Sequence, residues 1–297
     1  MQNPNFLNAQ NLPLQDRFIS DEHPHVLAAR ALMAQPTKDV PLLVFDVETT
    51  GLRPDRDKVI EIALQRIQVG CDPIQVSYVL NPGRPVSDEI YALTGISPEE
   101  VAAAQSFADV RAKIRALFEG AVLVAHNAPF DLGFLAAEFA GHGEKPPIQP
   151  VIDTLALAKG RFKFPNNKLT TIAGELGLVV RSDAHRAFAD VDMTAQVLQV
   201  MIERIQAQGL DVQTVKDIMS HTGSELLSVP IISSEMLHAI RSALLTGEDF
   251  TFNYKKVGQK RPQTRRVKVT SFDGVYVTGI DLDKGEDRQY RVDRISL

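Results

Sequence analysis

The sequence has one cysteine, and none of its apolar runs approaches the roughly 20 residues that span a bilayer. Cys71 alone cannot form an intramolecular disulfide, which excludes a disulfide scaffold and fits a reducing compartment. The first twenty residues lack the basic and apolar regions of a signal peptide. We therefore expect a cytoplasmic protein that does not associate with membranes. Gly70 and the pair Asp72-Pro73 place Cys71 in a hairpin turn, as a surface thiol.

Acidic residues outnumber basic ones, and the net charge of −5 is unevenly distributed. Residues 235–297 hold 12 Lys and Arg against 9 Asp and Glu, a balance of +3, which leaves −8 for the rest of the chain. An acidic catalytic domain is tolerable when bound cations neutralise its site. The basic excess at the other end of the chain suits contact with phosphates.

Strands and helices alternate along the first two thirds of the chain. Apolar runs bounded by turn residues predict strands at 41–45, 59–69, 74–80, 121–125 and 151–152. Helical spacing predicts helices at 25–33, 107–118, 130–139 and 190–205. An opening hairpin followed by alternating strands and helices indicates an α/β fold, with a mixed five-stranded sheet flanked by helices.

The pattern changes after residue 207. We expect a linking helix and turn at 211–229 and a short helix at 236–245. Strands are expected at 250–254, 267–270, 275–280 and 289–292. The sequence thus predicts a flexible extension (1–24), an α/β domain (25–207), a linker (208–234) and a small, mostly-β domain (235–297).

Four acidic residues and one histidine, in three short motifs, carry the chemistry. Asp46 and Glu48 follow the first strand two residues apart, so both side chains lie on one face. Asp131 is expected at the start of a helix after a central strand, and Asp190 at the opening of the long helix. Because Mg²⁺ and Mn²⁺ prefer oxygen ligands, these carboxylates predict a two-cation site. His185 beside it can act as a general base, which is the equipment for phosphodiester hydrolysis.

Each of these residues also has an ordinary structural interpretation. An isolated Asp-X-Glu pair is usually solvated, and a lone histidine in a polar loop, such as His185, is usually a surface residue. We assign His126 to packing or hydrogen bonding and leave it out of the metal site. The joint occurrence of the motifs, in this order and at this spacing, favours the catalytic interpretation.

The motifs FDVETTG (45–51), HNAPFD (126–131) and HRAFAD (185–190) resemble those of the DEDDh, or DnaQ-like, exonucleases, which include the proofreading epsilon subunit of bacterial DNA polymerase III. The resemblance covers roughly residues 25–207. It implies an RNase H-like fold, two divalent cations and 3′→5′ removal of nucleotides. LTGI at 93–96 and IDT at 152–154 agree with it.

Carried over by position, the resemblance implies that Asp46, Glu48 and Asp190 ligate the cations. Asp131 would hold the second cation directly or through water, and His185 would be the general base. The related DEDDy enzymes have a tyrosine four residues before the last aspartate, where this chain has Arg186. Only the histidine version of the mechanism is therefore available.

Residues next to the first motif are candidates for binding the terminal nucleotide. They are Thr49, Thr50, Gly51 and Leu52, whose backbone groups could approach it closely, with Gly51 leaving room. Phe130 is placed to pack on a base or ribose, as its counterpart does in the family, and core packing is the alternative. A single-stranded substrate is favoured because terminal bases are easiest to stack when unpaired. DNA is favoured over RNA by its frequency among substrates of the resembling family, and RNA is possible.

Basic residues gather in the C-terminal domain and form a candidate phosphate-binding patch, with a solvated hairpin loop as the alternative. The patch consists of Lys255, Lys256, Lys260, Arg261, Arg265, Arg266 and Lys268. Residues 236–297 also resemble a WYL domain, a small Sm-like β module, in FNY at 252–254, VYV at 275–277 and RQYRVDRI at 288–295. The name-giving tryptophan and leucine are replaced by Val275 and Val277. The resemblance implies nucleic acid or a nucleotide-like ligand bound through arginines such as Arg288 and Arg291.

Three functions are compatible with these features. The first is a metal-dependent 3′→5′ exonuclease whose C-terminal domain grips or senses nucleic acid. The second is a proofreading subunit with a polymerase or repair partner, although a β domain stands where a polymerase-binding tail would be expected. The third is a catalytically silent nucleic-acid-binding regulator, and the presence of all five motif residues argues against it. The oligomeric state is left open.

Overall fold

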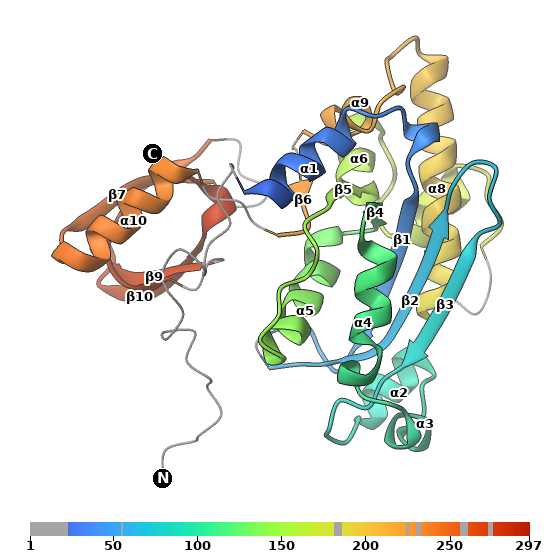
Figure 1. Ribbon diagram of the computed structural model, residues 1–297, viewed down its shortest axis with the longest axis horizontal. Helices are drawn as coiled ribbons and strands as arrows, with labels where there is room; N and C mark the ends of the chain where they lie inside the picture. Colours follow the sequence, from blue (N-terminus) through green and yellow to red (C-terminus); the bar gives the residue numbers. More distant parts are fainter. Residues whose placement is uncertain are drawn as a thin grey trace. The chain divides into compact units, whose positions relative to one another are not determined.

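The computed structural model describes residues 23–54, 56–180, 186–223, 226–229, 233–255, 261–272 and 276–297. The chain divides into two compact units, one of residues 28–229 and one that contains residues 230–297 (Figure 1). Each unit is described by itself below. Within the described ranges, none of the helices combines the length and apolar composition of a bilayer-spanning segment.

The first unit is built on a mixed sheet. Its strands are β1 (Leu42–Thr49), β2 (Val59–Ile67), β3 (Ile74–Val79), β4 (Val122–Ala125), β5 (Pro150–Asp153) and β6 (Leu226–Leu227). Their order is β3-β2-β1-β4-β5-β6, in which the pairs β1/β4 and β4/β5 are parallel and the other neighbours are antiparallel. Cys71 is exposed between β2 and β3, as expected.

The mixed sheet is confirmed, but in the part of the chain that the structure describes it has six strands rather than the five predicted. The sixth arises where a linking helix and turn were expected. Leu226 and Leu227 pair with Val151 and Pro150 of β5, which gives the open edge of β5 a short antiparallel partner. A two-residue strand carries no periodicity of its own, so its pattern could not reveal it.

Helices cover both faces of this sheet (Figure 1). The α-helices of the described residues before 226 are α1 (Pro24–Met33), α2 (Asp88–Thr94), α3 (Pro98–Ala103), α4 (Phe107–Phe118), α5 (Ala128–Gly141), α6 (Thr154–Arg161), α7 (Leu169–Glu175), α8 (Ala187–Ala207) and α9 (Val215–Ser220). Of these, α2 and α3 lie beyond the end of β2 and β3 (Figure 1). On β1, Leu43, Phe45 and Val47 lie in the main core with α4 and α5 residues such as Phe118 and Phe134. Because side chains alternate along a strand, the other β1 positions face α8, which packs against β1 and β2.

The long helix α8 begins at Ala187 rather than at Asp190, where the pattern predicted its start. The N–H of Ala187 donates to the buried carboxylate of Glu61 on β2, at 3.1 Å. A helix start leaves its first N–H groups without intrahelical partners, so this distant acceptor stabilises an additional turn. Asp190 consequently lies within the first turn of α8.

The described residues from 233 onward form a small antiparallel sheet with one α-helix. Its elements are α10 (Ser234–Thr246), β7 (Asp249–Tyr254), β8 (Gln263–Phe272), β9 (Tyr276–Asp281), β10 (Glu286–Arg291) and β11 (Ile295–Ser296), with the strand order β10-β9-β8-β7-β11. Phe252, Tyr254 and Tyr290 form its aromatic core, and Ile240 of α10 packs with them. The predicted mostly-β domain is confirmed.

Candidate metal centre and nucleic-acid-binding residues

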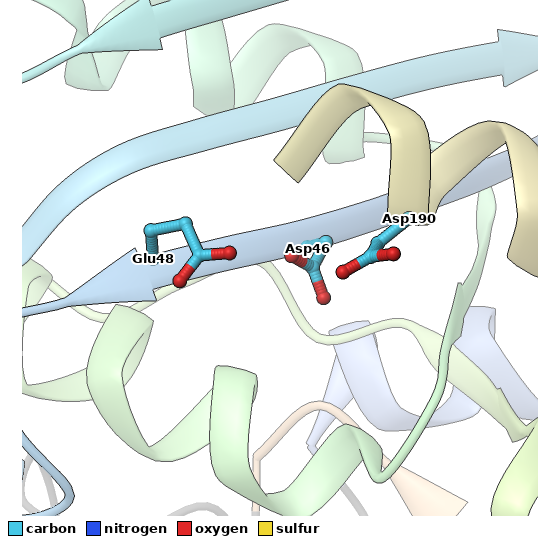
Figure 2. Close-up of side chains that lie close together, drawn as sticks. All are labelled: Asp46, Glu48 and Asp190. Atoms are coloured by element: carbon cyan, nitrogen blue, oxygen red, sulfur yellow. The ribbon is translucent and has the colours of Figure 1, made fainter. Parts of the chain in front are cut away.

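The carboxylates of Asp46, Glu48 and Asp190 form one cluster at the end of β1 (Figure 2). Asp46 and Glu48 occupy alternate positions of β1, so both face α8, and Asp190 meets them from the first turn of that helix. One carboxylate oxygen from each residue lies within 4.8 Å of the others, and all three residues are half-buried. The structure therefore brings together three of the four predicted metal ligands.

Burial and mutual repulsion make these carboxylates hard to ionise without a cation. Burial, followed by the charges of Asp190 and Glu61, raises the pKa of Glu48 to about 8, although Arg186 opposes the shift. Burial also raises the pKa of Asp46 well above its ordinary value, and the neighbouring carboxylates, Asp131 first among them, add to the shift. A divalent cation would supply the missing positive charge. The all-oxygen donor set thus fits a hard cation such as Mg²⁺ or Mn²⁺.

Asp131 lies close to this cluster but is not one of its three members. It is 2% exposed, and its Oδ1 accepts the backbone N–H of Val47 at 3.1 Å. β4 pairs with β1 only as far as Val44, so Asp131 provides an acceptor for β1 beyond that point. Burial raises the pKa of Asp131, while the Val47 N–H acts in the opposite direction.

A strained turn places Asp131 at the start of α5. Asn127, the residue before that helix, has a φ of 71°, in the left-handed region that non-glycine residues seldom adopt. Its N–H donates to Asp153 Oδ1 at 3.0 Å, and Asp153 also accepts the N–H of Leu155 at 2.9 Å. Asp153 therefore links the residue that follows β4 to the end of β5. Sequence reasoning noted this aspartate only as supporting the resemblance.

His126 has both ring nitrogens engaged, as predicted for a residue outside the metal site. Nδ1 lies 2.9 Å from Thr154 Oγ1, and Nε2 lies 3.0 Å from the carbonyl oxygen of Asn167. Burial lowers the pKa of His126.

His185, the predicted general base, lies outside the described residues.

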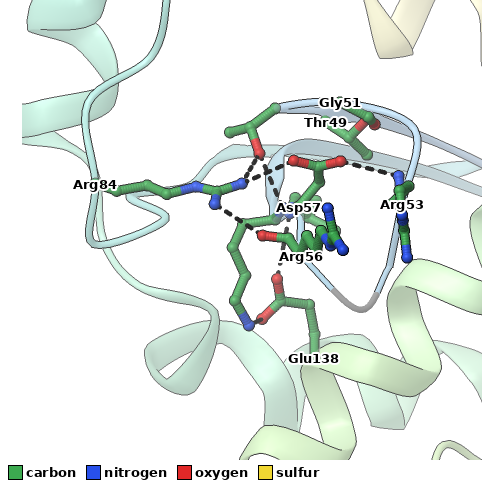
Figure 3. A network of polar contacts seen from close by, with 10 residues as sticks. Thr49, Gly51, Arg53, Arg56, Asp57, Arg84 and Glu138 are labelled. Carbon is green, nitrogen blue, oxygen red and sulfur yellow. Dashed lines mark hydrogen bonds and ion pairs between the residues drawn. The ribbon is translucent and has the colours of Figure 1, made fainter.

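The predicted nucleotide-binding loop is shaped by a polar network (Figure 3). Arg84 donates to Thr50 Oγ1, to Asp57 Oδ1 at 3.1 Å and to the carbonyl oxygen of Arg56 at 2.7 Å. Added at Gly51, a Cβ would lie 2.5 Å from Asp57 Oδ2. The space that we expected Gly51 to leave for a nucleotide is therefore occupied by the chain's own Asp57.

The two apolar candidates for substrate binding differ in exposure. Leu52 is 81% exposed, so its side chain is free to contact a ligand. Phe130 is half-buried, packs against the main core, and has its ring centroid 5.0 Å from that of Phe134. Core packing thus accounts for part of the Phe130 ring.

The predicted basic patch does not lie on one face of the C-terminal sheet. Arg265 shares the face of the buried Val267 on β8, whereas Arg266 is exposed on the opposite face. Lys255, Lys268 and Arg261 are exposed, and Arg291 is half-buried. Lys256 and Lys260 lie outside the described residues.

Arg288 belongs to a buried polar group in this sheet. Asp281 is fully buried and accepts the O–H of Tyr290, and Arg288 Nε lies 4.0 Å from its Oδ2. Although burial opposes ionisation, the pKa of Asp281 is lowered, because Tyr290, an Asp283 N–H and the charges of Arg265 and Arg288 favour its charged form. Arg288 and Arg265 thus have a structural role on the inner face of the sheet.

A mixed sheet with an acidic cluster at the end of its first strand, beneath a long helix, defines an RNase H-like nuclease domain. A family model described as exonuclease matches residues 43–198, and one described as WYL domain matches residues 235–297. The chain therefore belongs to this exonuclease family and carries a C-terminal WYL domain. Both resemblances drawn from the motifs are confirmed.

Relatives and solved structures agree with this assignment. The DNA polymerase III PolC-type proteins of Pediococcus pentosaceus and Bacillus cereus are each 36% identical to this chain, over 171 and 186 residues. These matches cover 57% and 62% of this chain but 12% of each polymerase. Exonuclease I of E. coli, solved in complex with a dA16 oligonucleotide, matches with a TM-score of 0.51 and 17% identity, over 82% of this chain and 55% of that one. This last likeness shows the fold.

Proposed function

We propose that this protein is a divalent-metal-dependent 3′→5′ exonuclease that releases nucleotides from nucleic acid, with single-stranded DNA as the favoured substrate. The observation that carries the proposal is the cluster of Asp46, Glu48 and Asp190, whose ligand oxygens lie within 4.8 Å of one another. It stands in a chain that belongs to an exonuclease family. We assign the exonuclease domain to residues 25–207 and the WYL domain to residues 235–297.

The proposed site holds two Mg²⁺ or Mn²⁺ ions through Asp46, Glu48 and Asp190, with Asp131 contributing to the second directly or through water. When bound, such ions stabilise the charge on the attacking and leaving oxygens of an in-line displacement at phosphorus. The loop Thr49–Leu52 and Phe130 orient the terminal nucleotide. The oligonucleotide bound to exonuclease I supports a single-stranded substrate.

His185 is proposed to accept the proton of the attacking water, and it must be neutral to do so. Activity should therefore fall as pH drops through the histidine range near pH 6.5, and rates at saturating Mn²⁺ between about pH 5 and pH 8 measure this. A His185→Gln variant should retain weak activity without that fall. An intact enzyme whose rate stays flat down to about pH 5 contradicts the assignment.

Purified protein with 5′-labelled DNA and RNA oligonucleotides tests the activity directly. Addition of Mg²⁺ or Mn²⁺ should produce a ladder that shortens from the 3′ end, and a chelator should stop it. Asp46→Asn should abolish the ladder, whereas Glu203→Gln, a matched change at an exposed carboxylate of α8, should not. Absence of metal-stimulated turnover on every substrate would favour the silent regulator instead.

The WYL domain is proposed to bind or sense nucleic acid through its exposed basic residues, which include Lys255, Arg261 and Arg266. Because counterions leave the phosphates on binding, this contribution should weaken as salt rises.

A second candidate, a proofreading exonuclease, is favoured by the PolC-type relatives. Co-purification with a polymerase would support it. The single cysteine supports a cytoplasmic location.

A further inference from the structure

Glu61 is a buried carboxylate next to the metal centre that the proposed chemistry does not use. It lies on β2 directly opposite Glu48 of β1 and is 2% exposed. Because opposite residues of paired strands share a face, Glu61 points to the same side of the sheet as Asp46 and Glu48, toward α8. Burying a carboxylate is unfavourable unless it is paired and hydrogen-bonded.

The partners of Glu61 come mainly from the start of α8. Arg186 donates to it twice, from Nε at 3.3 Å and from Nη2 at 3.2 Å. The N–H of Ala187 donates at 3.1 Å, and Ser77 of β3 donates through its hydroxyl at 3.0 Å. One carboxylate therefore joins the sheet to the first residue of α8 and to the residue before it.

This connection continues to the metal centre through one helical turn. The N–H of Asp190 donates to the carbonyl oxygen of Arg186 at 3.3 Å. The Asp190 carboxylate then meets Asp46 and Glu48 with oxygens within 4.8 Å. Any shift of Arg186 or of the helix start would be transmitted to Asp190 over this short path.

We infer that Glu61 is a positioning residue of the metal centre. It anchors the first turn of α8 to β2, and the anchored turn holds Asp190 within cation-binding distance of Asp46 and Glu48. Arg186 is the other half of the anchor and balances the charge of Glu61. This role rests on the proposed function, because it concerns the geometry of the same site.

Charge alone would give a different result from positioning. If Glu61 and Arg186 acted only through their electric fields, removal of the negative group would weaken cation binding and removal of the positive group would strengthen it. If they act as one anchor, removal of either releases the helix start and weakens cation binding. The sign of the Arg186 effect therefore separates the two explanations.

Binding of Mn²⁺ to the full-length protein, measured by isothermal titration calorimetry, tests the inference. Both Glu61→Ala and Arg186→Ala should bind Mn²⁺ roughly 10- to 100-fold more weakly, the range observed when groups that orient metal ligands are removed. Their kcat should fall while the KM for oligonucleotide changes little. Glu61→Gln should recover part of the affinity, because its amide oxygen can still accept the N–H of Ala187.

Glu144→Gln is the matched control, because Glu144 is also held by two arginines, Arg111 and Arg115, each at 2.8 Å. It should bind Mn²⁺ like the unmodified protein. Circular dichroism and thermal melting verify folding, and if Glu61→Ala does not fold, Glu61→Gln and Arg186→Ala decide. Unchanged or tighter Mn²⁺ binding by Arg186→Ala overturns the inference and leaves the exonuclease proposal intact. An unmodified protein that neither binds Mn²⁺ nor degrades oligonucleotides overturns both.

Discussion

Replacing Glu48 by glutamine should stabilise the metal-free protein at neutral pH, although Glu48 is a proposed metal ligand. Burial and the nearby carboxylates raise its pKa from 4.5 to about 8 in the folded chain. The folded state therefore holds a proton that the unfolded state releases, and stability falls as pH rises from about 4.5 to about 8. Glutamine resembles the protonated acid and carries no such dependence.

The magnitude follows from the displacement of the pKa. At about pH 7.5 the unfolded Glu48 is ionised while the folded one is largely protonated, which costs up to roughly 4 kcal/mol of stability at about 1.36 kcal/mol per pH unit. At about pH 5 the same cost is below roughly 1 kcal/mol. The Glu48→Gln variant should thus gain about 3 kcal/mol relative to the unmodified protein between these two pH values.

Urea unfolding followed by circular dichroism, with a chelator present, measures this difference. Since the same variant is compared with the unmodified protein at each pH, the contribution of the C-terminal unit cancels. Millimolar Mg²⁺ should reverse the order, because the unmodified site then gains binding energy that the variant lacks. A variant that is equally destabilised at both pH values, or an unmodified protein whose stability is flat over this range, refutes the reasoning.

Three further changes probe other parts of the molecule. Gly51→Ala brings a Cβ within 2.5 Å of Asp57 Oδ2 and should displace the nucleotide-binding loop. The KM should rise roughly fivefold, which corresponds to a loss of about 1 kcal/mol in substrate binding. An unchanged KM contradicts a role for this loop. Arg266→Ala should lower the salt dependence of single-stranded DNA binding by about 0.7 in the slope of log K against log salt, and an unchanged slope removes Arg266 from the interface. Asp131→Asn keeps an oxygen that can accept the Val47 N–H, so the protein should still fold. The Mn²⁺ stoichiometry measured by calorimetry should drop from two ions toward one. Two tightly bound ions would exclude Asp131 as a ligand.

Periodicity predicted the sheet well where its strands are buried and long. The helix at 107–118 has the predicted bounds, and the hairpin of β2 and β3 turns where Gly70 and Asp72-Pro73 indicated. The start of α8 and the strand β6 escaped prediction for one shared reason. Each depends on a partner distant in sequence, Glu61 for the N–H of Ala187 and β5 for Leu226 and Leu227.

Motifs predicted the site more readily than the groups that hold it in place. Alternation along β1 placed Asp46 and Glu48 on one face, and the motifs added Asp190, whose carboxylate the structure brings within 4.8 Å of theirs. The same reasoning gave no reason to select Glu61 or Arg84, because an isolated acid or base in a sequence is usually solvated. For the basic C-terminal patch, a run of charges in the sequence does not reveal that Arg265 and Arg266 lie on opposite faces of β8.

Two buried carboxylates, Asp131 and Glu61, oppose the mutual repulsion of the acidic cluster. Asp131 accepts an N–H of β1 between Asp46 and Glu48, and Glu61 accepts the first N–H of α8. Each of these two carboxylates accepts a backbone N–H that has no regular partner within its strand or helix. These hydrogen bonds, which lie on either side of the acidic cluster, oppose the repulsion within it. The three clustered acids, which are half-buried, are then held near one another, and the stability that their repulsion removes would be regained when a cation binds. Asp131 and Glu61 thus support the proposed metal centre through hydrogen bonds to the backbone on either side of it.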